Sequence, residues 1–399
     1  MLFEGRNFLI TILLIQLLIT IVGIDVPFIV ISIVGTAIAY VWCFLIRGHL
    51  FEAMYQHWLL TAFVIQGILW CLLSIAGIVS WFTFQRDFGV DIRYLPRQAY
   101  YLFFFPLLAV APYFPDKQLC MDLLHKYGRW MVPILFGINV FLTDSVCMSN
   151  VQLLWVGILA LWSNGYKMLD VINFILILCS AAFSPQMAQL VIAILFAGVW
   201  ILRRWKILRW LGCMTLPIVL ISSFVLPQIN GVIDWAWQVD VNTGWRLEYW
   251  ADEATAIVDT YGMGIGFGTT YASYEFSEPQ SEMIYNTENG FYGPRPFSQN
   301  DEYTKEERPF VTASHNSFVS VAFRQGILGL VLLVGSLVVV WKKIFYYEGF
   351  ESGAIIFAFC GSILLISTNV GLESPMYLLP TLGALCLVVA RVWPDLANN

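Results

Sequence analysis

The sequence has few charged residues. Only 12% of its 399 residues are Asp, Glu, Lys or Arg, whereas 59% are hydrophobic, and the mean hydropathy is +0.73. A water-soluble domain covers its surface with polar and charged side chains, so this composition argues against one. Apolar runs of about 20 residues recur along most of the chain, which predicts an all-α integral membrane protein.

Several signatures of functional sites are also missing. The eight cysteines are scattered through predicted helices or their ends, so they form neither a disulfide framework nor a metal-ligand pattern. The glycines at 262–268 lack the spacing of a nucleotide-binding loop. We also expect no nucleic-acid partner, no cofactor and no metal. Carboxylates are scarce within the apolar runs, and Asp170 lies near the start of a predicted helix rather than in its middle. A proton-coupled transporter would need buried carboxylates near the middle of the membrane, so their scarcity argues against one.

The apolar runs predict about twelve membrane-spanning helices. The basic cluster 203–209 assigns the orientation, because Lys and Arg gather on the cytoplasmic side. Both termini are then cytoplasmic, and the chain divides into nine spans in 1–226, a large external loop at 227–322 and three spans in 323–399. The N-terminus lacks a signal-peptide cleavage site and is assigned to the first span. The expected spans are roughly 8–24, 26–46, 58–84, 94–114, 127–143, 148–163, 167–183, 185–202, 207–226, 323–341, 353–371 and 376–392.

One external loop departs from the charge rule. It carries Arg86, Arg93 and Arg97 against two aspartates, although cations usually stay inside. Either the helix count is wrong by one, or these arginines are kept outside because they bind an anion.

The large external loop is acidic, with fourteen Asp and Glu between 227 and 315 against four cations. Apolar spacing predicts a helix over Trp245–Val258, capped by Thr243 or Asn242, and then a flexible glycine turn. Residues 275–308 are expected to form a polar flap, although their acidic run could also hold a divalent ion.

Arg246 is unusual because it is expected in the first turn of that helix, where the helix dipole disfavours a cation. Arg246 either pairs with Glu248 or nearby acids, or forms an anion site together with the helix N-terminus. Trp250 lies one turn later and could stack on the guanidinium or on a sugar face.

His315 is the one histidine expected outside, since His49, His57 and His125 fall on the cytoplasmic side. It stands where the large loop re-enters the bilayer, which makes it a candidate general base. The alternative is a polar cap at a helix start. Asn316 could orient the imidazole or serve as the helix N-cap.

Together these motifs resemble the O-antigen ligase and polysaccharide polymerase superfamily, whose members are membrane glycosyltransferases. His315 is followed by ten residues and Gly326, as in the H-x10-G element of that family. Gly-Trp-Arg246-Leu-Glu-Tyr-Trp250 is similar to its arginine-x-x-x-tryptophan helix, and 261–268 to its glycine-rich stretch. The large loop before the last three spans also matches.

The resemblance implies an architecture and a set of site residues. The architecture is that of type C glycosyltransferases, with short helices in the large periplasmic loop. His315 is implied as the catalytic base, while Arg246 and one of Arg86, Arg93 and Arg97 hold pyrophosphate, with Arg97 favoured because it sits at a helix mouth. The remaining implied substrate-binding residues are Trp250, Asn316, Arg324 and Glu373.

The implied function is the transfer of an undecaprenyl-pyrophosphate-linked glycan to a sugar hydroxyl at the periplasmic face of the bacterial inner membrane. The reaction is inverting and independent of metals, and its partners are the lipid-linked donor, a glycan or lipid A–core acceptor, the bilayer and polysaccharide-assembly proteins. Glu373, in the turn Asn369-Val-Gly-Leu-Glu373-Ser-Pro, favours a polymerase. An O-antigen ligase and a lipid-linked-glycan flippase or other transporter are the alternatives.

Overall fold

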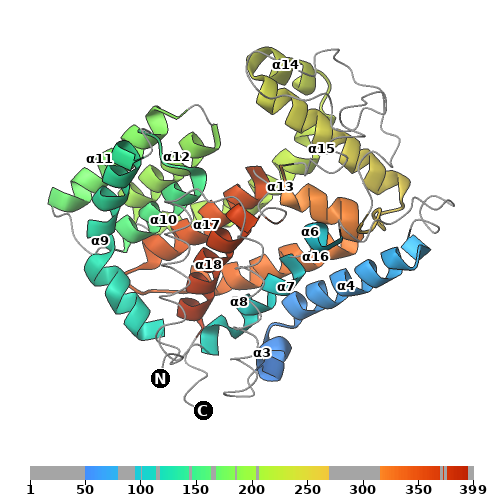
Figure 1. Ribbon diagram of the computed structural model, residues 1–399, viewed down its shortest axis with the longest axis horizontal. Helices are drawn as coiled ribbons and strands as arrows, with labels where there is room; N and C mark the ends of the chain where they lie inside the picture. The colour runs from blue at the N-terminus through green and yellow to red at the C-terminus, as the bar shows by residue number, and fades with distance from the viewer. Residues whose placement is uncertain are drawn as a thin grey trace.

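The computed structural model describes residues 50–79, 95–99, 101–113, 117–142, 146–162, 168–184, 187–203, 206–268, 315–368, 372 and 375–393, and within these ranges every regular element is a helix. All-α architecture is therefore confirmed for this part of the chain. Figure 1 shows the arrangement. The helices are α3 (Leu50–Gln56), α4 (Trp58–Ile75), α6 (Leu95–Ala99), α7 (Tyr101–Phe104), α8 (Pro106–Val110), η1 (Ala111–Tyr113), α9 (Lys117–Leu142), α10 (Asn150–Leu161), α11 (Met168–Ala182), α12 (Met187–Leu202), α13 (Ile207–Phe224), η2 (Leu226–Gln228), α14 (Val232–Val239), α15 (Val241–Asp259), α16 (Ser317–Phe345), α17 (Ser352–Thr368) and α18 (Pro375–Val392).

Helix α17 forms the centre of the core. It packs against α10, α12, α13, α16 and α18, and nearly all of its side chains are buried (Figure 1). A helix that is apolar on every side is covered by other helices or by lipid, and the sequence SGAIIFAFCGSILLIST of α17 meets this description. Gly157 of α10 allows the closest approach, because a Cβ there would lie 2.3 Å from the Phe357 ring.

A second apolar cluster supports the large loop. It joins α14 and α15 to the first half of α16 through buried side chains that include Leu247, Trp250, Val319 and Phe323. This cluster places α15 directly against the residues that follow His315. Figure 1 shows α14 and α15 projecting from one end of the helical core.

Several helix boundaries differ from the expected ones. The described part of the segment 94–114 comprises α6, α7, α8 and η1, and the α-helix is broken where Pro106 begins α8 and where Pro112 lies within η1. Proline lacks a backbone N–H and clashes with a preceding turn, which explains the breaks. Helix α9 begins at Lys117, about ten residues before the expected span, and α16 begins at Ser317 rather than near 323. The expected spans 8–24 and 26–46 lie outside the described residues.

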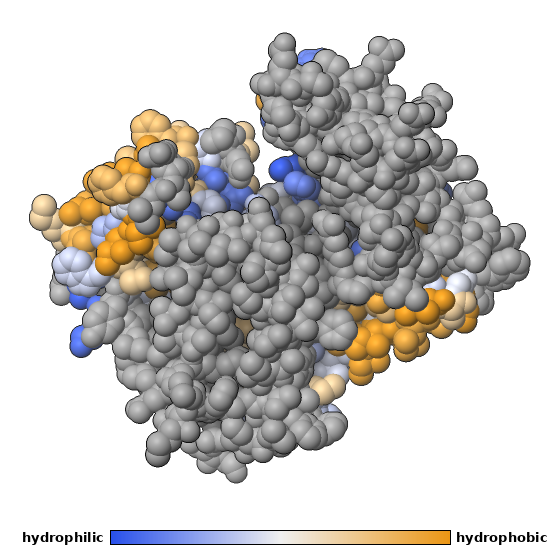
Figure 2. All heavy atoms as spheres, in the orientation of Figure 1, coloured by the Kyte–Doolittle hydropathy of each residue, from blue (hydrophilic) through white to orange (hydrophobic). Residues whose placement is uncertain are grey.

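Three of the described helices are long and apolar enough to cross a membrane: Trp58–Ile75, Ile207–Gln228 and Ser317–Phe345. Six shorter apolar segments accompany them. Many large apolar side chains face outward, and Figure 2 shows them gathered along α4 and over α11 and α12. Such outward apolar faces fit a protein that is surrounded by lipid.

Candidate active site

The turn before α16 is held by Asn316. The buried side chain of Asn316 accepts hydrogen bonds from the backbone N–H groups of Phe318 (3.1 Å) and Val319 (3.3 Å), and its amide donates to Ser223 Oγ of α13 (2.6 Å). Asn316 is therefore the N-cap of α16. His315, which precedes it, adopts φ 54°, a left-handed conformation that is uncommon outside glycine. Strain of this kind persists where neighbouring contacts fix the backbone.

Ser317 connects this turn to the segment between α17 and α18. Its hydroxyl accepts a hydrogen bond from the backbone N–H of Leu372 at 2.9 Å. The end of α17 reaches the same place, since the carbonyl of Thr368 lies 3.4 Å from Arg246 Nη1. Residues far apart in the sequence therefore meet at the start of α16.

Helix α15 supplies Arg246. The expected cap was wrong: Asp240 is the N-cap, because its carboxylate accepts from the backbone N–H of Thr243 (2.9 Å) and from its hydroxyl (2.7 Å). The helix consequently starts at Val241, and Arg246 lies in the second turn rather than the first. The helix dipole opposes a cation less at this depth, and the terminal N–H groups lie further from the guanidinium.

Arg246 and His315 are in contact. Nη2 of Arg246 lies 3.3 Å from Nδ1 of His315. Arginine can only donate hydrogen bonds, so Nδ1 acts as the acceptor and the neutral ring carries its proton on Nε2. Tyr377, at the start of α18, is close enough to interact electrostatically with the same guanidinium.

The environment keeps the imidazole neutral. Burial, followed by the positive charge of Arg246, lowers the pKa of His315 from 6.5 to about 3. A neutral ring can accept a proton, whereas an imidazolium cannot. The sequence predicted both residues as site candidates, and the structure brings them together across 69 positions of sequence.

The glycine-rich stretch is fixed rather than flexible, contrary to the expectation. Backbone N–H groups of Ile265 and Gly266 donate to the carbonyls of Phe323 (2.8 Å) and Arg324 (3.0 Å). In return, the N–H of Ile327 donates to the carbonyl of Gly262 (2.8 Å). The stretch therefore pairs with α16 in the manner of a short strand pair.

Gly326 makes this pairing possible. Its backbone (φ 76°, ψ −179°) is non-helical and kinks α16. The kink redirects the carbonyls of Phe323 and Arg324 toward the glycine stretch. Neither the kink nor the glycine stretch leaves room for a side chain. A Cβ at Gly326 would lie 2.4 Å from the Gly262 carbonyl oxygen, and one at Gly264 would lie 2.7 Å from Gly326 N.

Buried and partly buried polar side chains hold the kink from the other side. Gln98 Oε1 accepts from the N–H of Gly268 (2.7 Å) and from Arg324 Nη1 (3.0 Å), and Arg324 Nη1 also lies 3.3 Å from the Gly266 carbonyl. The amide of Gln66 on α4 donates to the carbonyl of Gln325 (2.9 Å). Arg324, predicted to bind substrate, is thus only 2% exposed and braces the glycine stretch.

Three acids of α15, Glu248, Asp252 and Glu253, are buried. Glu248 accepts from Trp237 Nε1 at 3.2 Å. Trp250 lies in the apolar cluster beside α16 and is 9% exposed. Each of these side chains is therefore buried between α15 and the elements that pack against it.

The other predicted residues are less fully described. Arg86, Arg93, Glu373 and the acidic flap 275–308 lie outside the described residues. Arg97 belongs to α6, next to Gln98. Sequence reasoning missed Ser223, Gln98, Tyr377 and the Thr368 carbonyl, since a backbone oxygen and long-range partners leave no local pattern. Among the residues that the structure describes, no group of three or more His, Cys, Asp or Glu side chains could hold a metal ion.

Comparison with known proteins gives one match. Residues 168–334 match the family model described as O-Antigen ligase. No curated protein matches the chain. The matched segment runs from α11 into α16 and includes Arg246, the glycine stretch, His315 and Gly326. This match supports the resemblance of the chain to the O-antigen ligase and polymerase superfamily.

Proposed function

We propose that this chain is a membrane glycosyltransferase that moves a glycan from undecaprenyl pyrophosphate to a sugar hydroxyl. The observation that carries the proposal is the 3.3 Å contact between Arg246 and a neutral His315 within the family-matched segment. In the proposed orientation both termini are cytoplasmic and this pair faces the periplasm of a bacterial inner membrane. The architecture is of the type C kind.

The proposed reaction is a single displacement. The acceptor hydroxyl attacks the anomeric carbon of the donor, the bond between that carbon and the pyrophosphate oxygen breaks, and the configuration inverts. His315 takes the hydroxyl proton, and undecaprenyl pyrophosphate leaves with the bonding electrons. Cationic side chains stabilise the charge on the leaving group, so the residues at hand require no metal.

Arg246 couples donor binding to the base. Before the donor arrives, its guanidinium occupies the Nδ1 lone pair of His315, and its charge lowers the imidazole pKa. A pyrophosphate draws the guanidinium to itself because a bidentate contact to phosphate is stronger than a contact to a neutral ring. Nδ1 is then released to accept a proton, and the nearby anion raises the pKa of His315.

A second arginine is proposed for the pyrophosphate. Arg97 is favoured over Arg86 and Arg93 because its neighbour Gln98 fastens α6 to the glycine stretch and to Arg324. This tie fixes the position of α6 relative to the kink of α16. The proposed substrate contacts from Trp250, Asn316 and Glu373 remain secondary to the arginines.

The acceptor distinguishes two versions of this function. We favour a polymerase, in which the acceptor is another glycan chain, over an O-antigen ligase acting on lipid A–core. Purified protein should be given lipid-linked repeat units with and without lipid A–core. Chain extension supports the polymerase, and transfer to lipid A–core supports the ligase.

Substitution of His315 tests the base. We expect His315→Ala and His315→Asn to reduce transfer per folded molecule by roughly 10²–10⁴-fold, the usual loss for a general base. Asn tolerates left-handed backbone, so His315→Asn preserves the turn while it removes the imidazole. Near-normal turnover in both variants would overturn the assignment and direct attention to Asp252 and Glu253.

A further inference from the structure

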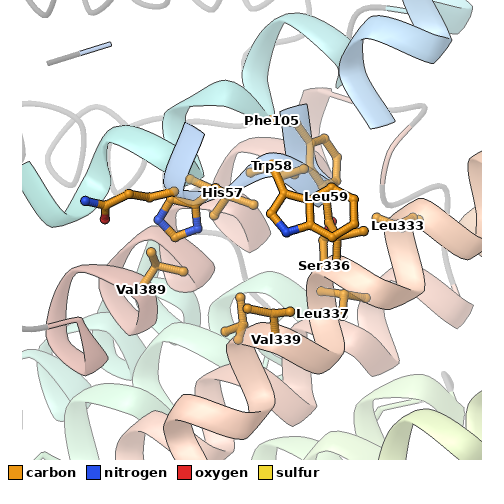
Figure 3. Close-up of a pocket in the computed structure, with 13 residues that line it drawn as sticks. His57, Trp58, Leu59, Phe105, Leu333, Ser336, Leu337, Val339 and Val389 are labelled. Carbon is orange, nitrogen blue, oxygen red and sulfur yellow. The ribbon is translucent and has the colours of Figure 1, made fainter. Parts of the chain in front are cut away.

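A pocket opens between α4, α8, α16 and α18, in the half of α16 that lies away from His315. Figure 3 shows it with its lining side chains. It lies at the start of α4 and near the ends of α16 and α18, so it is separate from the proposed active site. Its wall includes His57, Trp58, Leu108, Leu337, Val339 and Val389.

The wall of the pocket is mostly apolar, with Gln56, His57 and Ser336 as its polar members, and carries no charge at neutral pH. Leucine, valine and aromatic side chains form most of it. The Ser336 hydroxyl donates to the carbonyl of Leu332 at 2.7 Å, so it is satisfied within its own helix. Burial, followed by the charge of Lys343, lowers the pKa of His57 to about 4, so this imidazole is neutral. An uncharged wall of this kind suits hydrocarbon.

One cation, Lys343, lies close to the pocket. Lys343 follows the lining residues Val339 and Val340 by four and three positions, so it lies one turn further along the same face of α16. Its ammonium nitrogen lies 5.6 Å from the centre of the Trp393 ring, and that ring lies 4.8 Å from His57. Lys343 is exposed and can meet an anion at the rim.

The surroundings of the pocket match the boundary of a bilayer. Apolar side chains on α4 and α16, such as Ile65 and Val338, face outward, and Figure 2 shows the apolar band along α4. Tyr55, Trp58 and Tyr346 are exposed at the end where Lys343 lies. Exposed Trp and Tyr beside lysine are typical of the membrane–water interface.

We propose that this pocket binds an anionic phospholipid, with one acyl chain in the pocket and the headgroup phosphate beside Lys343. The positive charge of Lys343 favours an anionic lipid, because a zwitterionic lipid would neutralise this lysine only partly. The location selects it too, since an apolar pocket at the interface adjoins the lipid acyl chains. Basic pockets between membrane helices bind anionic headgroups in this way.

Native mass spectrometry of the full chain in detergent tests the proposal, with palmitoyl-oleoyl phosphatidylglycerol and the matching phosphatidylcholine as probes. We expect tighter binding of phosphatidylglycerol. Lys343→Gln should weaken it about five-fold, the effect of one cation near a headgroup, and weaken phosphatidylcholine binding less. Lys342→Gln is the matched control, because Lys342 lies about 100° around the helix axis from Lys343, further from the direction of the lining residues Val340 and Leu337.

The pocket itself is tested by filling it. Val339 lines the pocket and is 39% exposed, so Val339→Trp should block the acyl chain without disturbing the core. Val338, 49% exposed and not part of the wall, gives Val338→Trp as the control. Four results would overturn the proposal: equal binding of the two lipids, equal effects at Lys342 and Lys343, unchanged binding in Val339→Trp, or a preference for undecaprenyl phosphate over phosphatidylglycerol.

Discussion

The substitution Gly326→Ala adds only one methyl group, yet it should lower the stability of the fold strongly. Gly326 occupies φ 76° and ψ −179°, a region that is essentially restricted to glycine. Its new Cβ would also lie 2.4 Å from the carbonyl oxygen of Gly262 and 2.6 Å from that of Met263. Both neighbours are backbone atoms, so the kink and the glycine stretch must separate.

The expected loss has two parts. Holding alanine in this conformation costs about 1–3 kcal/mol. Separation disturbs the three backbone hydrogen bonds between 262–266 and 323–327, each with a net contribution of about 0.5–1.5 kcal/mol. Because the separation need not break all three completely, we expect the free energy of unfolding to fall by roughly 3–6 kcal/mol.

Gly335→Ala is the matched control. Gly335 lies in the same helix with a regular conformation, and a Cβ there would meet Leu59 at ordinary distances, 3.4 Å to Cδ1 and 3.8 Å to Cδ2. Alanine is favoured over glycine in a helix, so this variant should gain about 0.5–1 kcal/mol. The assay is the thermal unfolding midpoint of the purified proteins in detergent. If both variants shift the midpoint in the same direction, the account of the kink is refuted.

Two further predictions concern the charged pair. Arg246→Lys should reduce glycan transfer by about 10- to 100-fold, because a point charge cannot replace a two-pronged contact; full activity per folded molecule in Arg246→Ala would return this residue to a structural role. The second concerns pH. The pKa of His315 is about 3 in the folded protein and 6.5 when unfolded, so between these values the unfolded chain binds more protons and stability falls as the pH is lowered. The unfolding midpoint of His315→Asn should therefore fall less than that of the wild type between about pH 7 and pH 5, and equal slopes would contradict the burial of a neutral imidazole.

Periodicity predicts the helices well because most of them lie in continuous apolar runs. Helix α17 is the clearest case, since its sequence is apolar on every side and its position is the centre of the core. Boundaries were less accurate where a single side chain decides them. Asp240 caps α15 in preference to Thr243 because its carboxylate accepts from the N–H of Thr243, a choice that depends on local geometry.

The sequence predicted which residues form the candidate site, but not how they are arranged in space. His315 and Arg246 were selected from position, charge and family motif, whereas their contact depends on how α15 packs against α16. The glycine stretch looked flexible because composition describes only the freedom of the isolated chain. Its partners are carbonyls of Phe323 and Arg324, and such backbone acceptors become available only when Gly326 bends the helix.

The hydrogen bond between Gln66 and Gln325 can form only after both residues have been synthesised. Its two residues are 259 positions apart, and at roughly 5–20 residues per second the second follows the first by about 10–50 s. Ser74 likewise meets Phe267 across 193 positions. During this interval the amide of Gln66 depends on temporary partners in an apolar helix. The contact between α4 and the kink of α16 is therefore made late in biosynthesis, when α16 docks on a helix that was synthesised long before.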